Sequence, residues 1–443
     1  MTTPAEPQSL LLQMLDPAHR ADPYPHYGRI REQGPLQLPD SNLTVFSSFA
    51  DCDEVLRHPS SASDRMKSTV AQRMVADGAQ ARPLGQPGFL FLDPPDHTRL
   101  RRLVSKAFVP KVVNALEPEI STLVDGLLAE ASSPDPFEAI AGLAYPLPVA
   151  VICRLLGVPL EDEPQFSAAS ALLAQSLDPF LTVTGASDDG FEERMKAGLW
   201  LRDYLRGLIA QRRRDPGEDL MSGLIHVEES GDQLTEEEIV ATCNLLLIAG
   251  HETTVNLIAN AILALLREPA QWAALAADPS RVTAVIEETL RYDPPVQLMG
   301  RVAGEDMSIG AVAGGLERSD RGSVAGGLER SDRGSVAGGL ERSDRGSVIV
   351  PKGDNMLVLL AAAHRDPEAF EHPDRFDPDR AAIRHLGFGK GPHFCLGAPL
   401  ARLEAAVALT AMTARFPNAA LAGEPTYKQN VTLRGMSMLP ISL

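Results

Sequence analysis

A long apolar segment, from about residue 235 to residue 267, constrains the fold of this chain more than any other feature. Thr235 and Glu238 have the spacing of a capping box at its start, and Pro269 ends it. Its middle reads LLLIAGHETTVNLIANAILALL, which is apolar on all sides and therefore predicts a buried helix. Such a helix would span roughly 50 Å, so the fold has to be built around it.

Polar residues interrupt the centre of this segment: His251, Glu252, Thr253 and Thr254. Buried polar groups cost free energy unless they are hydrogen bonded. These four residues are therefore either a solvated stretch at a groove in the core or part of a functional site. For Thr253 the simpler alternative is a hydrogen bond to a carbonyl of the preceding turn. The local pattern leaves both interpretations open.

Outside this segment the pattern predicts a mainly α protein with small β-sheets. Apolar residues recur at helical spacing in 120–131 and 196–213, whereas the Pro-rich residues 1–90 predict loops, a small sheet and brief helices. The net charge of -18 argues against binding to nucleic acid or to an anionic membrane. The N-terminal residues have neither the pattern of a signal peptide nor that of a spanning helix, so we expect a cytoplasmic protein without a membrane anchor.

A perfect tandem repeat occupies residues 312–347. The unit VAGGLERSDRGS occurs three times, carries few apolar residues, and its charges cancel. Its period is too short for the usual helical solenoids. We therefore expect a flexible surface insertion, tolerated as exposed loops tolerate insertions, with a small hairpin stack as the alternative.

The cysteines are scattered and never form a CxxC pair, which argues against a zinc site or a disulfide framework. Cys153 and Cys243 lie in apolar runs and are expected to be small buried hydrophobes. Cys395 differs from them, because glycines precede it and a segment with helical spacing follows it. The N-terminus of a helix stabilises a thiolate, which can bind iron or attack carbon, although a lone cysteine is usually structural.

Two further pairs of residues lie on single helical faces. Glu288 and Arg291 are three residues apart, and His97 and Arg101 are four apart. The first spacing is that of a common salt bridge, and the second suits the binding of carboxylates. Each is also what a solvated helix face shows, so neither pair alone indicates a function.

Taken together and in this order, the motifs resemble those of the cytochrome P450 family of the bacterial soluble type. The matching stretches are AGHETT at 249–254, Glu288-x-x-Arg291, PDRF at 373–376 and FGKGPHFCLG at 388–397. The resemblance covers nearly the whole chain and is interrupted only by the repeat. It implies a cytochrome P450 fold and one catalytic domain over residues 1–443, with a haem buried between the long distal helix and the cysteine loop with its helix.

The resemblance also implies roles for the residues on the two sides of that haem. Cys395 would be the axial ligand of the iron of haem b, where a thiolate favours cleavage of the O–O bond. Glu252 and Thr253 would be the catalytic acid and alcohol that deliver protons to O2, the co-substrate. Ala249 and Gly250 are small and would leave room for O2.

Further residues match family positions around the haem. Glu288, Arg291 and Arg375 match a structural triad that stabilises the cysteine loop. Cationic or donor side chains suit the haem propionates. The residues expected to hold the propionates are His97, Arg101, Arg301 and His393, and the other expected contacts of the cofactor are Ala249, Gly250, Phe388, Cys395 and Gly397.

The expected activity is haem-dependent monooxygenation, in which one oxygen atom of O2 enters an organic substrate. The chain leaves no room for a flavin or nicotinamide domain, so electrons would come from a separate ferredoxin and ferredoxin reductase, docked on Arg102, Lys106 and Arg402. The alternatives are a haem-thiolate peroxygenase that uses H2O2, a haem-binding sensor without turnover and, more remotely, a cysteine hydrolase. The Glu252–Thr253 pair argues against the peroxygenase, because a peroxide route needs no proton relay.

The candidate substrate contacts are nearly all apolar, which indicates a small apolar or amphipathic organic substrate. The same residues would suit an ordinary core equally well. They are Phe89, Leu90, Leu245, Ile248, Val296, Leu298, Met299, Met436 and Met438.

Overall fold

The computed structural model describes residues 6–82, 84–132, 136–175, 190–227, 234–310 and 346–443, and helices dominate this part of the chain. The prediction of a mainly α protein with small sheets is confirmed. The α-helices are α1 (Pro7–Leu15), α2 (Tyr24–Gln33), α3 (Phe49–Arg57), α4 (Thr69–Ala76), α5 (Asp96–Val104), α6 (Pro110–Asn114), α7 (Glu117–Ala129), α8 (Pro146–Leu156), α9 (Glu163–Gln175), α11 (Phe191–Arg214), α12 (Leu220–Val227), α13 (Glu236–Arg267), α14 (Pro269–Ala277), α15 (Val282–Tyr292), α16 (Leu360–His364) and α17 (Ala398–Arg415).

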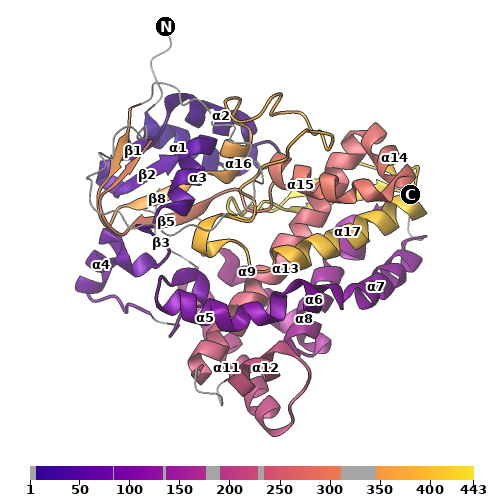
Figure 1. Ribbon diagram of the computed structural model, residues 1–443, viewed down its shortest axis with the longest axis horizontal. Helices are drawn as coiled ribbons and strands as arrows, with labels where there is room; N and C mark the ends of the chain where they lie inside the picture. Colours follow the sequence, from indigo (N-terminus) through magenta and orange to yellow (C-terminus); the bar gives the residue numbers. More distant parts are fainter. Residues whose placement is uncertain (1–5, 83, 133–135, 176–189, 228–233, 311–345) are drawn as a thin grey trace, which may run out of the picture.

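The described strands form small sheets at the edges of this helical body. The largest has the order β1-β2-β8-β5-β3, and β8 runs parallel to β2 and antiparallel to β5. Figure 1 shows this sheet on one side of the molecule with α1, α2, α3 and α16 around it, while most other helices lie on the other side. The strands are β1 (Leu36–Leu38), β2 (Leu43–Phe46), β3 (Ser61–Ala62), β4 (Phe137–Glu138), β5 (Met299–Ala303), β6 (Met307–Ile309), β7 (Val348–Val350), β8 (Asn355–Val358), β9 (Ala420–Leu421), β10 (Thr426–Tyr427), β11 (Met436–Met438) and β12 (Pro440–Ser442).

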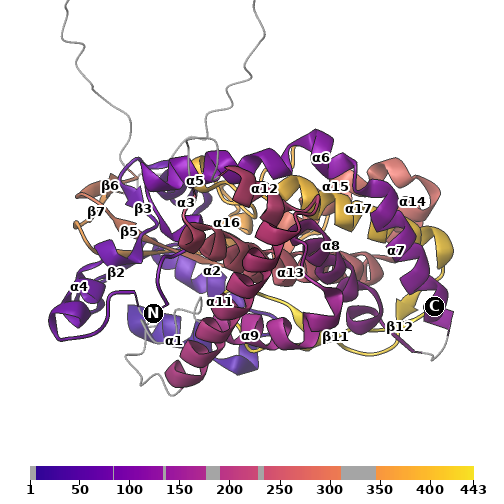
Figure 2. The same ribbon diagram turned by 90° about the horizontal axis from the view of Figure 1, so that it is seen from below.

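The long apolar segment forms the helix α13, and its predicted start is confirmed. The Thr235 hydroxyl accepts a hydrogen bond from the Glu238 N–H, and the Glu238 carboxylate accepts one from the Thr235 N–H. The helix passes through the centre of the molecule (Figure 2) and contacts α8, α11, α15 and α17. By length and composition it could cross a membrane, but 65% of its most apolar window is buried inside the protein, as expected of a core helix.

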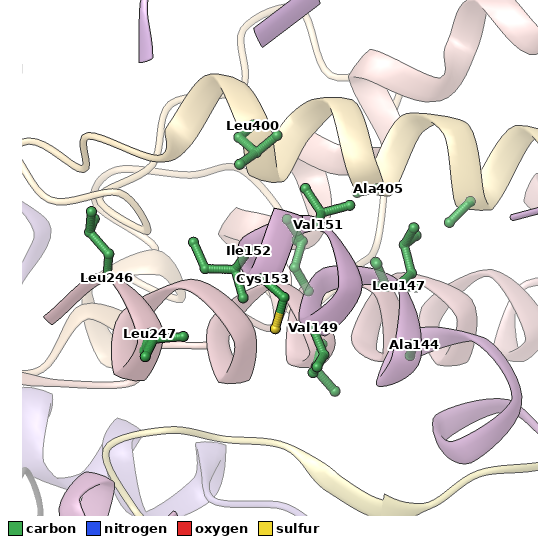
Figure 3. Packing of buried hydrophobic residues seen from close by; sticks show 14 of the residues in the cluster. Ala144, Leu147, Val149, Val151, Ile152, Cys153, Leu246, Leu247, Leu400 and Ala405 are labelled. Carbon is green, nitrogen blue, oxygen red and sulfur yellow. The ribbon is translucent and has the colours of Figure 1, made fainter. Parts of the chain in front are cut away.

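The main core cluster lies around α13. Figure 3 shows part of it, where Ile152 and Cys153 of α8 and Leu246 of α13 share a packed region with Leu400 and side chains near it on α17. Because α17 follows Cys395 directly, this core fixes the position of the helix after the cysteine relative to the centre of α13. The burial of Cys153 confirms that it is a small core hydrophobe, and Cys243 is buried as well.

The tandem repeat lies, except for Gly346 and Ser347, outside the described residues. The strands that flank it are paired, because β6 and β7 form an antiparallel hairpin in which Ile309 faces Val348. The insertion therefore leaves the local strands intact.

Candidate functional site

Glu252 and Thr253 lie near the middle of α13. The Thr253 hydroxyl donates a hydrogen bond to the Ala249 carbonyl at 2.8 Å, and the Thr254 hydroxyl donates one to the Gly250 carbonyl at 3.3 Å. The simpler alternative for these threonines, a bond to the preceding turn, is thus what the structure shows. The Thr253 hydroxyl is held on its own helix and would have to leave the Ala249 carbonyl to donate elsewhere.

Ala249 and Gly250 form a stretch of small residues in the same turns. A Cβ atom at Gly250 would lie 3.0 Å from Ile152 of α8, so the two helices approach closely there. Ala249 is exposed, although residues 245–247 before it are buried. The helix α13 is therefore accessible to solvent at Ala249, near the middle of its length.

The loop before Cys395 makes the tight turn that its glycines predict. Gly389 and Gly391 have φ angles of 69° and 66°, in the left-handed region that glycine adopts at low cost. A Cβ atom at Gly391 would lie 2.7 Å from the Leu56 carbonyl oxygen, so a larger residue would not fit. The Cys395 N–H donates to the Phe388 carbonyl at 2.8 Å and closes the loop.

Cys395 lies just before the N-terminus of α17, as predicted, with Gly397 as the N-cap. Burial raises the pKa of the Cys395 thiol, and this outweighs the lowering caused by the N–H groups of Gly397 and Ala398 and by Arg101 and Arg402. The N-terminus of α17 does favour the thiolate, as expected, but by itself it does not bring the pKa of Cys395 below the ordinary value of a thiol. A bound cation would be the additional charge that keeps the sulfur deprotonated.

Four donor side chains gather next to this loop from three separate elements. His97 and Arg101 come from α5, Arg301 from β5, and His393 from the cysteine loop. The rings of His97 and His393 lie 4.0 Å apart between centroids. Arg101 donates to the Phe394 carbonyl, next to Cys395. The structure therefore brings together the four residues that the sequence assigns to carboxylate binding.

The two histidines of this cluster have ring nitrogens without hydrogen-bond partners among the described residues. Neither ring nitrogen of His97 has a hydrogen-bond partner there, nor does Nδ1 of His393. Arg301 is 8% exposed, and the hydrogen bond recorded for its guanidinium goes to the neighbouring Gly300 carbonyl. Burial lowers the pKa of Arg301 to about 10 and that of His393 to about 3, and nearby positive charges add to both effects. Buried donors without acceptors are expensive, so this cluster fits an anionic group.

Two charged residues near these donors were not predicted from the sequence. The Arg65 guanidinium lies 5.0 Å from the centroid of the Phe91 ring, and its charge contributes to the lowered pKa of Arg301. Asp93 pairs with Lys67 at 2.8 Å, and its negative charge acts on Arg301 in the opposite direction. Nothing in the local sequence of Arg65 or Asp93 indicates that their charges act on the β5 arginine.

The predicted structural triad is correct for two members and wrong for the third. Glu288 and Arg291 are fully buried and form an ion pair at 2.7 Å. The Arg375 side chain is 66% exposed, and only its carbonyl takes part, as the acceptor of a hydrogen bond from Arg291. The second guanidinium on Glu288 belongs to Arg380, at 3.0 Å. Arg375 points outward because the turn at residues 373–380 presents its carbonyl, not its side chain, to the pair.

A second charged group connects the two ends of the cysteine loop and was also not predicted. Glu287 of α15 contacts His385, before the loop, at 2.9 Å and Arg402 of α17, after it, at 2.6 Å. The Arg402 guanidinium also lies 4.5 Å from the centroid of the Phe388 ring. The charge of Arg402 is thus compensated within the protein.

Five of the nine candidate substrate contacts belong to one region. Phe89, Leu245 and Met436 are buried in the main core cluster, and Leu90 and Ile248 pack against it. Phe89 and Leu90 belong to the short helix Phe89–Phe91. This helix contacts α13, so both residues lie close to α13. This grouping is compatible with one wall of a pocket beside α13.

The other four candidates lie apart from that region. Leu298 is 1% exposed and packs in a separate cluster with the N-terminal helices. Val296 and Met299 pack against a third cluster on the sheet side. Met438 is 42% exposed. The structure therefore does not bring all nine residues together.

Glu252 has a partner that the sequence analysis missed. The Lys428 ammonium donates to the Glu252 carboxylate at 3.2 Å. The two residues are 176 positions apart, and no local pattern predicts their contact.

Comparison with models of protein families assigns this chain to one family. A family model described as Cytochrome P450 matches residues 47–313 and 344–440. The match covers the regions of all the sites described above and leaves out residues 314–343, which are most of the repeat. The residues between the two matched stretches are therefore an addition to the family pattern.

Relatives and solved structures agree with this match. The chain is 37% identical to the Vitamin D(3) 25-hydroxylase of Pseudonocardia autotrophica over 430 residues, covering 95% of this chain and 94% of that protein. It is 36% identical to the cytochrome P450 monooxygenase PikC of Streptomyces venezuelae over 450 residues, covering 99% and 95%. The ligand-free crystal structure of Mycobacterium smegmatis CYP164A2 matches with a TM-score of 0.86 and 66% identity, covering 98% of this chain and 100% of that one.

Proposed function

The chain belongs to the cytochrome P450 family, and from that premise we propose that Cys395 is its iron ligand and that the protein inserts one oxygen atom of O2 into an apolar or amphipathic substrate. Members of this family are monooxygenases that use haem b and O2. The overall reaction combines R–H, O2, two electrons and two protons into R–OH and H2O. The residues described above can be assigned to parts of it.

One observation carries the assignment of the haem site. Four buried or half-buried donors from three separate elements converge beside Cys395, and both ring nitrogens of His97 and Nδ1 of His393 have no hydrogen-bond partner among the described residues. Two propionate groups would supply the missing acceptors, and His97, Arg101, Arg301 and His393 would hold them. Phe388 and Gly397 would contact the haem from the cysteine loop.

When bound, the haem supplies the iron that binds and reduces O2, with a thiolate ligand that favours O–O cleavage. The protein's own residues then supply protons and exclude excess water. Glu252 and Thr253 lie within about one turn of the exposed Ala249 on α13. We assign proton delivery to Glu252 and Thr253, and the space for O2 to Ala249 and Gly250.

We propose that a ferredoxin, reduced by a ferredoxin reductase, supplies the electrons on the cysteine side. Arg102 and Lys106 are exposed there, and Phe394, next to Cys395, is 39% exposed. Arg402 contributes less charge to such a surface than the sequence suggests, because Glu287 compensates it. Charge reversal at Arg102 and Lys106 is expected to slow electron transfer from ferredoxin, and unchanged transfer would exclude this docking surface.

The apolar character of the substrate is supported by the residues beside α13. Phe89, Leu245 and Met436 belong to the main core cluster around α13, and Leu90 and Ile248 pack against it. One relative of similar length is a Vitamin D(3) 25-hydroxylase, which acts on a large apolar molecule. We expect ligands of this class to shift the spin state of the haem.

The decisive experiment is a difference spectrum of the reduced protein with and without CO. The wild type should show the spectrum of a thiolate-ligated haem, and Cys395→Ser should lose it. Cys153→Ser is the matched control, because Cys153 is a buried cysteine in the core and should keep the spectrum. A thiolate-type spectrum in Cys395→Ser would overturn the assignment, and product formation from a spin-shifting ligand would separate an enzyme from a sensor.

A further inference from the structure

The loop between β10 and β11, residues 428–435, carries a lysine to the centre of α13. Lys428 Nζ lies 3.2 Å from Glu252 Oε1, and the two side chains are 29% and 12% exposed. An ion pair of this kind is worth more than one on the open surface, because less water screens it. Among the residues that the structure describes, Lys428 is the cation in ion-pair contact with Glu252.

The loop lies directly on α13, one turn after Glu252. A Cβ atom at Gly435 would be only 1.9 Å from the Asn256 side chain, so glycine is required for this contact. The Lys428 N–H donates to the Gly435 carbonyl at 3.0 Å, which closes the loop. The backbone of Lys428 is therefore fixed relative to the helix that carries Glu252.

Buried charges hold the far end of the same loop. Arg434 pairs with Asp293 at 2.8 Å, and the Tyr24 hydroxyl donates to the same carboxylate at 2.7 Å. The Arg434 N–H donates to the Pro295 carbonyl at 2.8 Å. Pairing costs Lys428 side-chain entropy, but it does not also have to order the backbone that presents this side chain.

A phenol lies within electrostatic reach of the acid as well. The Tyr145 hydroxyl donates to Glu163 at 2.5 Å and contacts Ser167 at 2.8 Å. Burial raises the pKa of Tyr145 to about 12, and the negative charges of Glu163 and Glu252 contribute. Tyr145 thus stays neutral at working pH and does not replace Lys428 as a counter-charge.

Beside the pair lies a polar group without a protein partner. Asn256 is 1% exposed, and neither atom of its amide has a hydrogen-bond partner among the described residues. Buried polar groups of this kind are commonly satisfied by ordered water. The environment one turn from Glu252 therefore suits a water molecule that could exchange protons with the acid.

We propose that Lys428 is a positioning residue for oxygen activation: it holds Glu252 against the 428–435 loop and controls the proton that Glu252 passes toward Thr253. The proposal rests on the proposed function, in which Glu252 supplies protons. In this arrangement Glu252 gives one proton toward the oxygen and regains one from water, while Lys428 keeps its own. Without Lys428 the carboxylate would be half-buried and uncompensated, and its side chain would no longer be directed.

The test compares Lys428→Met with Lys428→Arg and with Lys352→Met. Lys352 is the matched control, because its ammonium also lies 3.2 Å from a carboxylate, that of Glu305, on the exposed β6–β7 side. We expect Lys428→Met to lower the fraction of electrons recovered in product about three- to tenfold, with the remainder in peroxide, and to raise the solvent isotope effect on product formation. Lys428→Arg should restore most of this coupling, meaning the fraction of electrons recovered in product. Lys352→Met should have the same coupling as the wild type.

A double-mutant cycle shows whether Lys428 acts through Glu252. In a Glu252→Gln background, Lys428→Met should cause no further loss, because the group that it positions is gone. The C–O stretching frequency of the reduced CO complex gives a readout independent of turnover, and it should shift in Lys428→Met but not in Lys352→Met. Thermal unfolding of each variant excludes a loss of fold, and Lys428→Gln replaces Lys428→Met if the latter is unstable.

The outcomes distinguish a failure of the role given to Lys428 from a failure of the proposed function. Wild-type coupling and an unshifted C–O frequency in both Lys428→Met and Lys428→Gln would overturn the positioning role, as would full additivity with Glu252→Gln. Those results would leave the haem-thiolate assignment unaffected. Absence of a thiolate-type CO spectrum in the wild type would instead overturn the proposed function itself.

Discussion

The Glu288 carboxylate and the Arg380 guanidinium lie 3.0 Å apart, with the two side chains 0% and 11% exposed. Glu288 therefore accepts hydrogen bonds from two guanidinium groups, those of Arg291 and Arg380, and also from the Asp377 N–H at 2.8 Å. A buried carboxylate needs several donors to offset its desolvation. Arg380 supplies the charge that sequence comparison assigns to Arg375.

Replacing Arg380 with Ala is expected to destabilise the protein by about 2 kcal/mol, the typical value of hydrogen bonds to a buried charge. Replacing Arg375 with Ala should cost at most about 0.5 kcal/mol, because its side chain is exposed and its carbonyl remains. Urea unfolding of both variants, followed by the visible spectrum of the haem, measures the difference. Equal costs, or a larger cost at Arg375, would contradict the role given to Arg380.

The features predicted best from the sequence are local ones. The capping box needs only Thr235 and Glu238, three residues apart, and the turn before Cys395 needs only the glycines that precede it. In both cases the interacting groups lie within one turn of chain, so backbone geometry fixes the contact. The family resemblance added the order of the motifs, and the fold that it implied is the one observed.

The features that were missed depend on the path of the chain between distant residues. Arg375 and Arg380 are both arginines in one irregular turn, and which side chain turns inward is decided by backbone angles that no periodic pattern reports. Lys428 reaches Glu252 across 176 residues, through a loop whose position depends on Gly435. The same reason explains Leu298, whose apolar side chain suits a pocket wall and a core equally well.

Glu287 should make the stability of the protein depend on pH in the acid range. Its carboxyl is partly buried, but the His385 and Arg402 contacts lower its pKa from 4.5 to about 2. A lowered folded-state pKa stabilises the protein above the unfolded pKa, and this contribution is lost as the pH falls from about 4.5 toward about 2. The contribution at neutral pH is on the order of 3 kcal/mol at most.

The variant Glu287→Gln tests this directly. It should be less stable than the wild type at pH 7, and the difference should shrink as the pH falls below about 4.5. Glu305→Gln is the control, because Glu305 is an exposed acid in a surface pair. Urea unfolding at a series of pH values gives the curves, and a difference that does not change with pH would show that Glu287 contributes through packing alone.

Glu404 of α17 should have the opposite effect. Its side chain is 2% exposed, Oε2 lacks a hydrogen-bond partner among the described residues, and burial raises the pKa of Glu404 to about 8. The folded state therefore keeps the proton that the unfolded state releases, and stability is lost as the pH rises from about 4.5 to about 8. Glu404→Gln should be more stable than the wild type at pH 8 and nearly equal to it at pH 4. An unchanged pH dependence would rule out Glu404 as its source.

Removal of residues 312–347 should leave the fold intact, because the β6–β7 hairpin does not depend on them. Ile309 and Val348 are paired, so the deletion joins them through Gly310 and Ala311 alone. Gly310 has a φ of 86°, and a glycine with positive φ suits the first position of a two-residue hairpin turn. Shortening the connection also lowers the entropy cost of closing it, by roughly 2 to 3 kcal/mol.

We therefore expect the deletion variant to unfold at the same or a higher urea concentration and to keep the CO spectrum of the wild type. A variant without residues 312–335, which keeps one copy of the unit, should lie between the two. A loss of the spectrum on deletion would mean that the repeat contributes to the haem side of β5, the strand that carries Arg301.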